Sequence, residues 1–598
     1  MEKIKTNSGF KKIRKIIFRT IISLILLLLL VCISLSQPFV QTKIANYFTE
    51  RINKDFGTKI NIEQVAFTVF GGVKLKKVLI LDHHKDTLIY AKRIKTSILD
   101  FNKLINGKLL FGDIFLDQFY LKVKNYKGET NTNLDLFFNA FNDGKPSSGN
   151  FLMKSDNIIL SDSRFVMLDY NKVIPKDLDF SEINAKLKAF NIKGPNVSTT
   201  INTMSFKDHR GIYVKNLTSD FIYTKRCIVL NKLKLKTNNS FLDGKIVLDY
   251  NIENGDFKDF NNRVIFDVHV DSSQIATNDI RYFYSELSQN KTFNIKTIIR
   301  GTLNDFYASN IDLIDNKSSK INGNVKFKNL FSRSPGAFYM NGNFKEISSN
   351  YLDLTNLLPN ILGKKLPSSL QKLGQFNFAG KVEVSSQFIN SNFKMKTALG
   401  FVKSDLEMSE IENIDNAKYK GNVVLENFNI GALINDKNVG SVSLDINVDG
   451  KGLKLKNINT RFKGDIFKFN YNGYNYSKIL VNASITDPVF KGDFNINDPN
   501  LFMDFNGVLD LSKSVNNFDF HSEIDYANLE KLKLVNDSIS IFKGDIIVKA
   551  KGTSIDDFTG GILITEASYQ NKKDLYFIDH LDLNSSFGND GVRSIIIQ

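Results

Sequence analysis

The sequence predicts a mostly β protein: one long, twisted antiparallel sheet curved into an open apolar groove, with an N-terminal transmembrane helix and a few short helices. Three observations lead to this expectation. Apolar and polar residues alternate along many segments, as they do in strands with one buried and one wet face. Segments with helical periodicity are few. One apolar run of membrane-spanning length stands near the N-terminus.

Composition narrows the classes of protein that this chain can form. It has 598 residues, and 79 Lys and Arg against 63 Asp and Glu give a net charge of +16. Its 42% hydrophobic and 24% charged residues exclude a largely disordered chain. Two Cys residues exclude a disulfide scaffold and a multi-thiolate zinc protein. Only residues 142–150 resemble a linker, so residues 57–598 are expected to form one elongated body.

The N-terminus predicts a membrane anchor. Residues 1–15 are basic and are expected to stay in the cytoplasm, because positive charge marks the cytoplasmic side of a membrane segment. Residues 16–36 can cross the bilayer as one helix, with Ile21, Ile25, Leu28 and Val31 in its apolar core. The rest of the chain would then be exported. A signal peptide cleaved after Ser34-Leu35-Ser36 is the alternative.

Helices are predicted at four further places. A juxtamembrane helix is expected over 38–56, with Pro38 near its start and Gly57 just past its end. Short helices are expected over 134–141 and 280–287. A helical break at 352–373, which Pro359 kinks or splits, can plug or cap the groove.

The clearest alternating segments supply the residues expected to line the groove. On each of these segments one set of alternate residues is apolar, and such residues point to one face of a strand. The predicted groove residues are Val264, Phe266, Val268, Val270, Phe293, Ile295, Phe376, Phe378, Val442, Leu444, Ile446 and Val448. Asp267 and Asp445 are expected on the opposite face. Near copies at 462–466, 490–494 and 542–546 indicate a reused hairpin pattern of strand, Gly-containing kink and strand.

An apolar sheet face must be covered. Helices are too few, and an outer-membrane barrel is hard to combine with a helical anchor. We therefore expect acyl chains, held in a curved sheet, to cover this face. The alternative is a set of ordinary β-sandwiches, in which the same Phe and Val residues form the cores.

Residues 60–123 resemble the start of TamB and AsmA proteins. The segments that carry the resemblance are INIEQV at 60–65, GGVKLKKVLILD at 71–82, LIYAKRI at 88–94 and GDIFLDQFYLKV at 112–123. The segment LPNILGKKLPSSLQKLGQFNFAGKV at 358–382 is similar to the helix-then-strand break of AsmA-like proteins of Bacteroidota. The resemblance implies a bridge-like lipid-transfer protein built of β-grooves, anchored in the bacterial inner membrane with its body in the periplasm. It also implies an outer-membrane BamA-type barrel as a partner, through a C-terminal region that this sequence lacks, and a native protein that continues beyond residue 598.

No motif predicts catalysis. The chain has no G-x-S-x-G, H-E-x-x-H, phosphate-binding loop or C-x-x-C, so no enzyme activity, cofactor or nucleic-acid partner is expected. His83-His84, flanked by Asp82 and Asp86, is one tempting metal cluster. We interpret it as a polar hairpin turn between Leu81 and Leu88, and we expect no metal site. The positive net charge has two interpretations: the Lys and Arg residues bind anionic lipid headgroups, or they simply form the solvent-exposed face and edges of the sheet.

The predicted function is therefore a lipid bridge. Phospholipid would move between inner and outer membranes, with acyl chains against the apolar face. The alternative is a scaffold for outer-membrane protein translocation and assembly, whose sheet edges pair with client strands.

Overall fold

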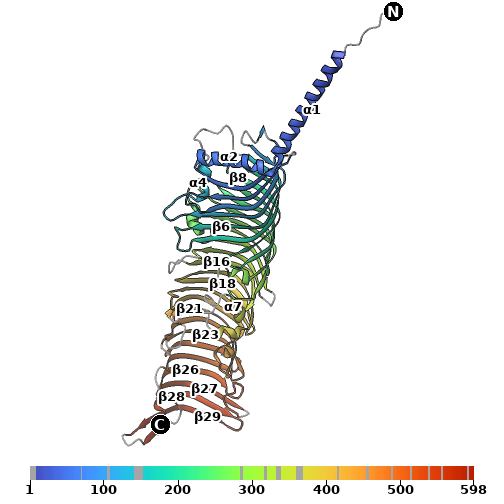
Figure 1. The fold of residues 1–598 in the computed structure, drawn as a ribbon. Coiled ribbons are helices and arrows are strands. Elements are labelled where there is room, and N and C mark those ends of the chain that lie inside the picture. Colours follow the sequence, from blue (N-terminus) through green and yellow to red (C-terminus); the bar gives the residue numbers. More distant parts are fainter. Residues whose placement is uncertain are drawn as a thin grey trace, which may run out of the picture. The chain divides into compact units, whose positions relative to one another are not determined.

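The computed structural model describes residues 8–598 except 69–70, 101, 104–107, 141–151, 283–286, 316–318, 331–337, 358–367, 414–415, 453–456, 487–488, 512–514, 537–538, 554–556 and 589–591. The chain divides into unit 1, Met1–Ser285, and unit 2, Glu286–Gln598. The described part holds thirty strands that hydrogen bonding assigns to one mixed sheet (Figure 1). The predicted mostly β class is confirmed, while the predicted linker at 142–150 lies outside the described residues.

Two helices open unit 1. They are α1 (Ser8–Ser36) and α2 (Pro38–Phe56). The bounds of α2 match the predicted juxtamembrane helix. Pro38 occupies the first turn, where its missing N–H costs no hydrogen bond, and Gly57 ends the helix with a φ of 65°.

Unit 1 contains the first twelve strands. They are β1 (Lys59–Phe67), β2 (Gly72–Leu81), β3 (Thr87–Ser97), β4 (Lys108–Phe111), β5 (Ile114–Asn125), β6 (Leu152–Asp169), β7 (Lys176–Lys193), β8 (Asn196–Asp208), β9 (Tyr213–Tyr223), β10 (Cys227–Lys236), β11 (Phe241–Asp249) and β12 (Ile265–Ala276). The predicted antiparallel sheet has one departure, because β4 and β5 both pair with β6 in parallel and make the sheet mixed. The chain leaves β5 through helix α4 (Asn133–Ala140) before β6, as a parallel connection requires.

Helix α2 covers the free edge of β1. The Gln41 side chain accepts from the Phe67 N–H at 2.6 Å and donates to the Phe67 carbonyl at 3.2 Å. Thr42 forms the same pair of bonds with Val65, and Asn53 forms it with Ile60. These polar side chains replace a neighbouring strand, so they block strand addition at this edge.

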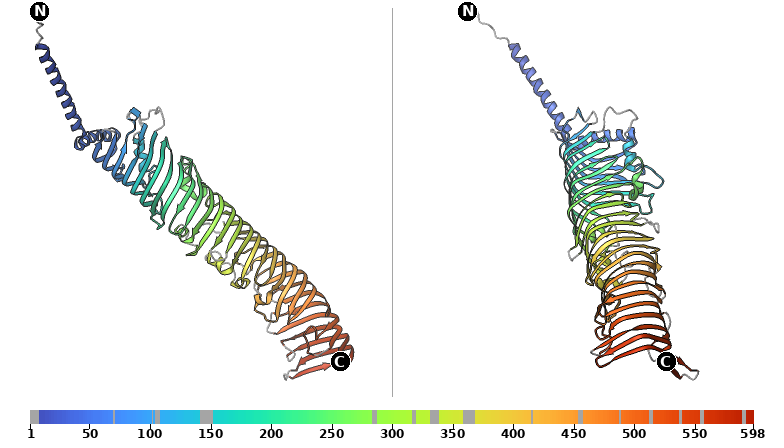
Figure 2. Two further views of the ribbon diagram at one scale, coloured as in Figure 1. Left: turned by 90° about the vertical axis from the view of Figure 1, so that its right-hand side faces the viewer. Right: turned by 180° about the vertical axis from the view of Figure 1, so that it is seen from behind.

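Unit 2 contains the other eighteen strands, and each described pair of neighbours is antiparallel (Figure 2). They are β13 (Thr292–Gly301), β14 (Phe306–Asp315), β15 (Lys320–Lys328), β16 (Tyr339–Asn350), β17 (Gln375–Ser385), β18 (Phe388–Lys396), β19 (Phe401–Ser409), β20 (Lys418–Asn429), β21 (Val439–Lys451), β22 (Asn459–Tyr471), β23 (Tyr474–Thr486), β24 (Val489–Asp498), β25 (Leu501–Asp510), β26 (Asn516–Asn528), β27 (Ser540–Gly552), β28 (Thr559–Asn571), β29 (Leu575–Phe587) and β30 (Arg593–Ile597).

Strand register in unit 2 builds an unbroken apolar row across the sheet. Residues that face each other on neighbouring strands point to the same side. Following these partners gives one residue from each strand from β13 to β26, and every one is aliphatic, Met or Phe. This apolar row is Ile295, Leu313, Ile321, Ile347, Phe378, Met395, Val402, Leu425, Leu444, Ile466, Ile479, Ile496, Met503 and Ile524.

The opposite face carries an equally continuous polar row. It runs from β17 to β26 through Lys381, Asn392, Asp405, Asn422, Asn447, Lys463, Asn482, Asp493, Asn506 and His521. All of these side chains except Asn422 are exposed, whereas no member of the apolar row is. The sheet of unit 2 therefore has one apolar and one wet face.

Unit 1 has a shorter apolar row. It runs through Leu109, Met153, Ile192, Val197, Tyr223, Ile228, Leu248 and Phe266, from β4 and β6 to β12. In each unit, the alternation of apolar and polar residues along the strands thus produces a row of apolar side chains on one face of the sheet.

The predicted helical interruptions are met in part. Helix α4 matches the helix expected over 134–141, although Phe141 lies outside the described residues. The described helix α6 (Thr277–Ile280) only reaches the start of the helix expected over 280–287, and residues 283–286 of that expected helix lie outside the described residues. The break at 352–373 begins with α7 (Tyr351–Leu357) and ends with the 3-10 helix η2 (Ser368–Leu373), and the residues between them are not described.

The repeated Phe-Lys-Gly-Asp segments do not form hairpins as predicted. Each lies inside a single strand, β22, β24 or β27. Gly464 faces Ile446 and Val481 on neighbouring strands, on the apolar face. A Cβ atom there would lie 2.2 Å from the Asp445 carbonyl oxygen, so glycine permits a close backbone approach.

Gly464→Ala should therefore lower the free energy of unfolding of unit 2 by about 2 kcal/mol, through overpacking against the backbone. Urea unfolding of the full chain measures the change. Gly561→Ala is the control, since its Cβ would meet only the Asn584 side chain, which can move. Equal stability of the Gly464→Ala chain and the parent would contradict this explanation.

Candidate functional site

The predicted groove residues of unit 2 lie together on the apolar face. Ile295, Phe378 and Leu444 are members of the apolar row itself. Phe293, Phe376, Val442, Ile446 and Val448 lie two or four positions along the same strands and therefore share this face. Asp445 lies on the opposite face as predicted, paired across strands with Val424 and Asp465.

In unit 1 the predicted residues are placed unequally. Phe266 belongs to the unit 1 apolar row, and Val268 and Val270 follow on the same face. Val264 is different, because it precedes β12 at the end of helix α5 (Phe260–Arg263) and is 0% exposed. It is a core residue and cannot line an open surface. That the residues of the two units share one groove stays a prediction.

Short helices and turns cover one border of the apolar face in unit 2. They follow the ends of β16, β20 and β26, which are the same ends of the antiparallel strands. Leu354 of α7 closes a small cavity over Phe293, Leu313 and Ile321. Two apolar clusters also lie along this border. The cluster at η2 contains Leu370, Leu373, Phe428, Val442 and Leu444. The cluster at the turn after β26 contains Ile479, Ile496, Leu501 and Leu532.

This cover leaves the middle of the apolar face accessible. Val442 is 4% exposed, but Ile446 and Val448, further along the same strand, are only half-buried. No packed second sheet lies over them among the described residues. The accessible part of the face is therefore the candidate surface for an apolar ligand.

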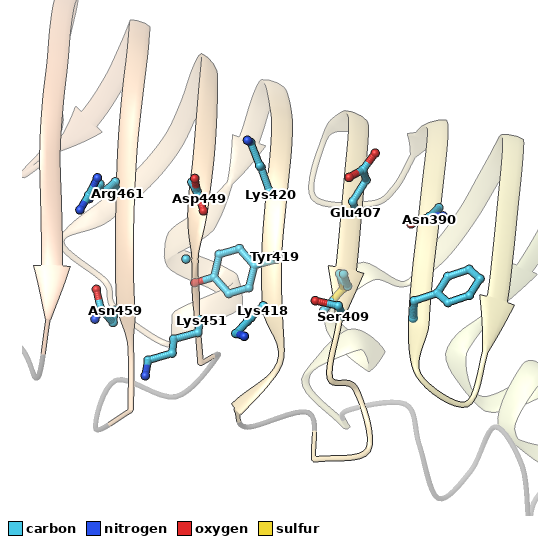
Figure 3. Close-up of a pocket in the computed structure, with 13 residues that line it drawn as sticks. Asn390, Glu407, Ser409, Lys418, Tyr419, Lys420, Asp449, Lys451, Asn459 and Arg461 are labelled. Carbon is cyan, nitrogen blue, oxygen red and sulfur yellow. The ribbon is translucent and has the colours of Figure 1, made fainter. Parts of the chain in front are cut away.

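A cavity of about 540 Å³ lies on the wet face, which the sequence did not indicate (Figure 3). Glu407, Lys420, Asp449 and Arg461 are successive cross-strand neighbours along it. With Lys418 and Lys451, its lining holds four cations and two carboxylates. The site is rich in charge, although Phe388, Met408 and Tyr419 also line it.

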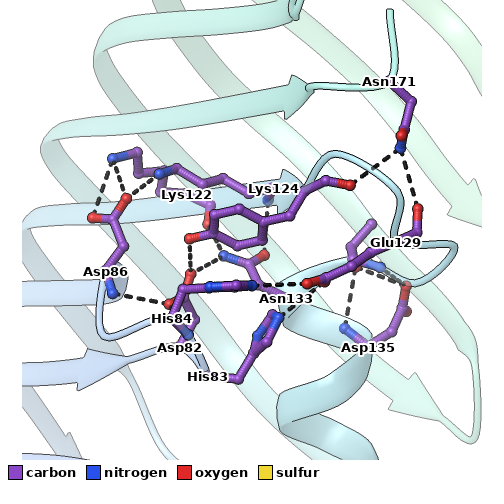
Figure 4. A network of polar contacts seen from close by, with 12 residues as sticks. Asp82, His83, His84, Asp86, Lys122, Lys124, Glu129, Asn133, Asp135 and Asn171 are labelled. Carbon is purple, nitrogen blue, oxygen red and sulfur yellow. Dashed lines mark hydrogen bonds and ion pairs between the residues drawn. The ribbon is translucent and has the colours of Figure 1, made fainter.

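A second polar cluster joins two loops of unit 1 (Figure 4). His83 and His84 lie in the turn between β2 and β3, as predicted, and Glu129 lies in the loop after β5. Nε2 of His83 is 2.9 Å from Oε2 of Glu129, and Nε2 of His84 is 2.7 Å from Oε1. The three ligand atoms lie within 4.8 Å of one another.

The flanking carboxylates do not join this cluster. Asp82 is 3% exposed and accepts from Tyr126 Oη at 2.8 Å, Asn133 Nδ2 at 2.9 Å and the N–H groups of His84 and Asp86. Asp86 instead accepts from the ammonium groups of Lys122 and Lys124. Both aspartates therefore hold the loops in place. Sequence reasoning missed Glu129 because only the folded topology brings it to the turn.

The same contacts shift two acid groups. Burial opposes ionisation of Asp86, but hydrogen bonds from Lys124 and Lys122 outweigh it and lower its pKa from 3.8 to about 2. Burial likewise opposes ionisation of Asp82, yet bonds from Asn133, Asp86, Tyr126 and His84 hold its pKa below the usual value.

Acid should consequently loosen this end of unit 1. A carboxyl group whose folded-state pKa is lowered stabilises the fold above its unfolded pKa, and this contribution disappears as the pH falls through the folded pKa. We expect hydrogen exchange of the amides of His84 and Asp86 to accelerate between pH 4 and pH 2, beyond the intrinsic change. Asp82→Asn, which removes the titrating acceptor of both amides, should flatten the profile, and an unchanged profile would contradict the assignment.

The membrane prediction rests on α1. Ile21, Ile25, Leu28 and Val31 are all exposed on this helix, at 50%, 53%, 61% and 49%. Within the described residues, no helix meets the combined demands of length and apolarity for crossing a membrane.

Comparison with known proteins gives no relative. No family model, no curated protein and no solved structure matches the chain. The resemblance to TamB and AsmA proteins therefore stays a prediction, and the function has to be argued from the surfaces described above.

Proposed function

We propose that the chain is a non-enzymatic phospholipid-transfer bridge of the TamB and AsmA type, whose apolar face holds acyl chains. The observation that carries this proposal is the apolar row of unit 2, which passes through successive strands without a polar residue. A binding site for a compact ligand needs a few specific contacts. An uninterrupted apolar strip instead suits a ligand that slides.

The energetics of acyl chains fit such a surface. Each CH₂ group removed from water contributes about 0.8 kcal/mol, whichever aliphatic side chain it meets. Neighbouring positions along the row therefore offer similar affinity, and a lipid can pass from one to the next without a deep trap. The headgroup would stay at the uncovered border, in water.

The proposed location is the bacterial inner membrane, with the body in the periplasm. The exposed aliphatic side chains of α1 are the support for an anchor, together with the basic residues before it. Phospholipid would pass toward the outer membrane, where a BamA-type barrel is the proposed partner.

The scaffold alternative has less support at the N-terminal edge of the sheet. Strand addition needs free backbone N–H and carbonyl groups. Helix α2 engages those groups on Ile60, Val65 and Phe67.

Photo-crosslinking tests which face meets lipid. A photoreactive residue in place of Ile466 should capture phospholipid from cells, because Ile466 is a member of the apolar row. The same residue in place of Asp465, on the same strand but the opposite face, should not. Equal capture at both positions would overturn the proposal.

A further inference from the structure

The loop cluster in unit 1 combines ligand types that suit a transition metal. Two imidazole nitrogens and one carboxylate converge from two loops, and each carboxylate oxygen faces a different imidazole. Zn²⁺ takes such N and O ligands at about 2.0–2.2 Å. Tetrahedral geometry at that bond length places ligand atoms about 3.3 Å apart. The present spacings of 2.7 and 2.9 Å need only a small opening.

The loops beneath the cluster are held in place before any ion binds. Asp82 and Asn133, 3% and 1% exposed, connect the histidine turn to the start of α4. The Tyr126 hydroxyl donates to Asp82, and the Tyr126 ring lies 4.0 Å from the His84 ring. Asn171 donates to the Glu129 carbonyl at 3.1 Å and accepts from the Gly128 N–H at 2.8 Å.

Accessibility distinguishes this cluster from a buried ion pair. The side chains of His83, His84 and Glu129 are 33%, 49% and 30% exposed, so an ion can enter from solvent. Water can supply a fourth ligand, as it does in zinc sites with three protein ligands.

We propose that His83, His84 and Glu129 bind one Zn²⁺ ion, which ties the β2–β3 turn to the loop between β5 and α4. The site is separate from the apolar face, and it reverses our expectation of no metal site. The bound ion stabilises this end of the sheet, because an ion that binds only the folded state raises the unfolding temperature.

The test uses the full chain, purified in detergent without a polyhistidine tag and stripped with a chelator that is then removed. Titration calorimetry with Zn²⁺ should show one ion per chain with a Kd below about 10 µM. Glu129→Gln keeps the size and hydrogen-bonding shape of the side chain but removes the anionic ligand. It should weaken binding at least ten-fold, and His84→Ala should do the same.

His521→Ala is the matched control, since His521 also contacts a carboxylate, that of Asp545. It should bind Zn²⁺ like the parent chain. Zn²⁺ should raise the unfolding temperature of the parent and of His521→Ala but not that of Glu129→Gln. Circular dichroism checks that each variant folds. Absence of stoichiometric binding at 100 µM Zn²⁺, or parent-like affinity of a folded Glu129→Gln chain, overturns the proposal.

Discussion

Replacing both Ile446 and Val448 by Asp should abolish capture of phospholipid by the chain. Both side chains lie in the accessible middle of the apolar face. An ionised carboxylate without a partner costs several kcal/mol in apolar surroundings. Each factor of ten in affinity corresponds to about 1.4 kcal/mol, so two such charges should lower the phospholipid bound per chain more than ten-fold. Quantitative lipid extraction from the purified chain measures this.

The matched control adds the same charge to the wet face. Asn447 and Asn482 are exposed and flank Lys463 in the polar row, so Asn447→Asp with Asn482→Asp should leave bound lipid unchanged. The sequence alone would also suggest Leu444 as a position for the introduced charge, but the structure argues against this choice. Leu444 is a buried member of a packed cluster, so a charge there would unfold its surroundings, whereas Ile446 contacts this cluster only from its half-buried edge. Equal lipid in both double variants would show that this face is not the binding surface.

Asp82→Ala should strongly destabilise unit 1. The substitution leaves the hydroxyl of Tyr126 and an amide hydrogen of the buried Asn133 without their acceptor. It also removes the acceptor of two backbone N–H groups in the turn. Each buried donor left without an acceptor costs about 1–3 kcal/mol, so a total loss of about 3 kcal/mol or more is expected. Urea unfolding followed by tyrosine fluorescence measures it.

Asp117→Ala provides the comparison. Asp117 pairs with Arg93 at 2.7 Å on the strand surface, where the arginine side chain is 54% exposed. Exposed pairs of this kind contribute about 1 kcal/mol or less. If Asp82→Ala destabilised unit 1 no more than Asp117→Ala does, the buried network would not have the structural role assigned to it.

The strands were predictable because the chain mostly folds back on its previous strand. Each hairpin then transfers the alternation of one strand to the next, so Phe378 and Leu444, 66 positions apart in the sequence, fall in one row. Helix α2 was predictable because Pro38 and Gly57 mark its two ends.

Other features depend on contacts that no local pattern encodes. The parallel pairing of β5 with β6 needs a crossover whose last part lies outside the described residues. In the sequence, Val264 continues the apolar alternation of β12. In the structure it lies at the end of the short helix α5, before the strand begins, so the alternation of the strand does not explain its burial. The inward orientation of Asp82 and the approach of Glu129 follow from the loop after β5, which sequence spacing does not place.

Mass spectrometry of the purified full chain tests the central claim most directly. The chain would be extracted in a mild detergent, with the Ile446→Asp and Val448→Asp variant prepared in parallel. The proposal predicts that phospholipid stays with the parent chain after extensive washing and is lost from the double variant. If the folded parent chain carries no more phospholipid than the double variant, the apolar face does not hold lipid and the bridge function is wrong.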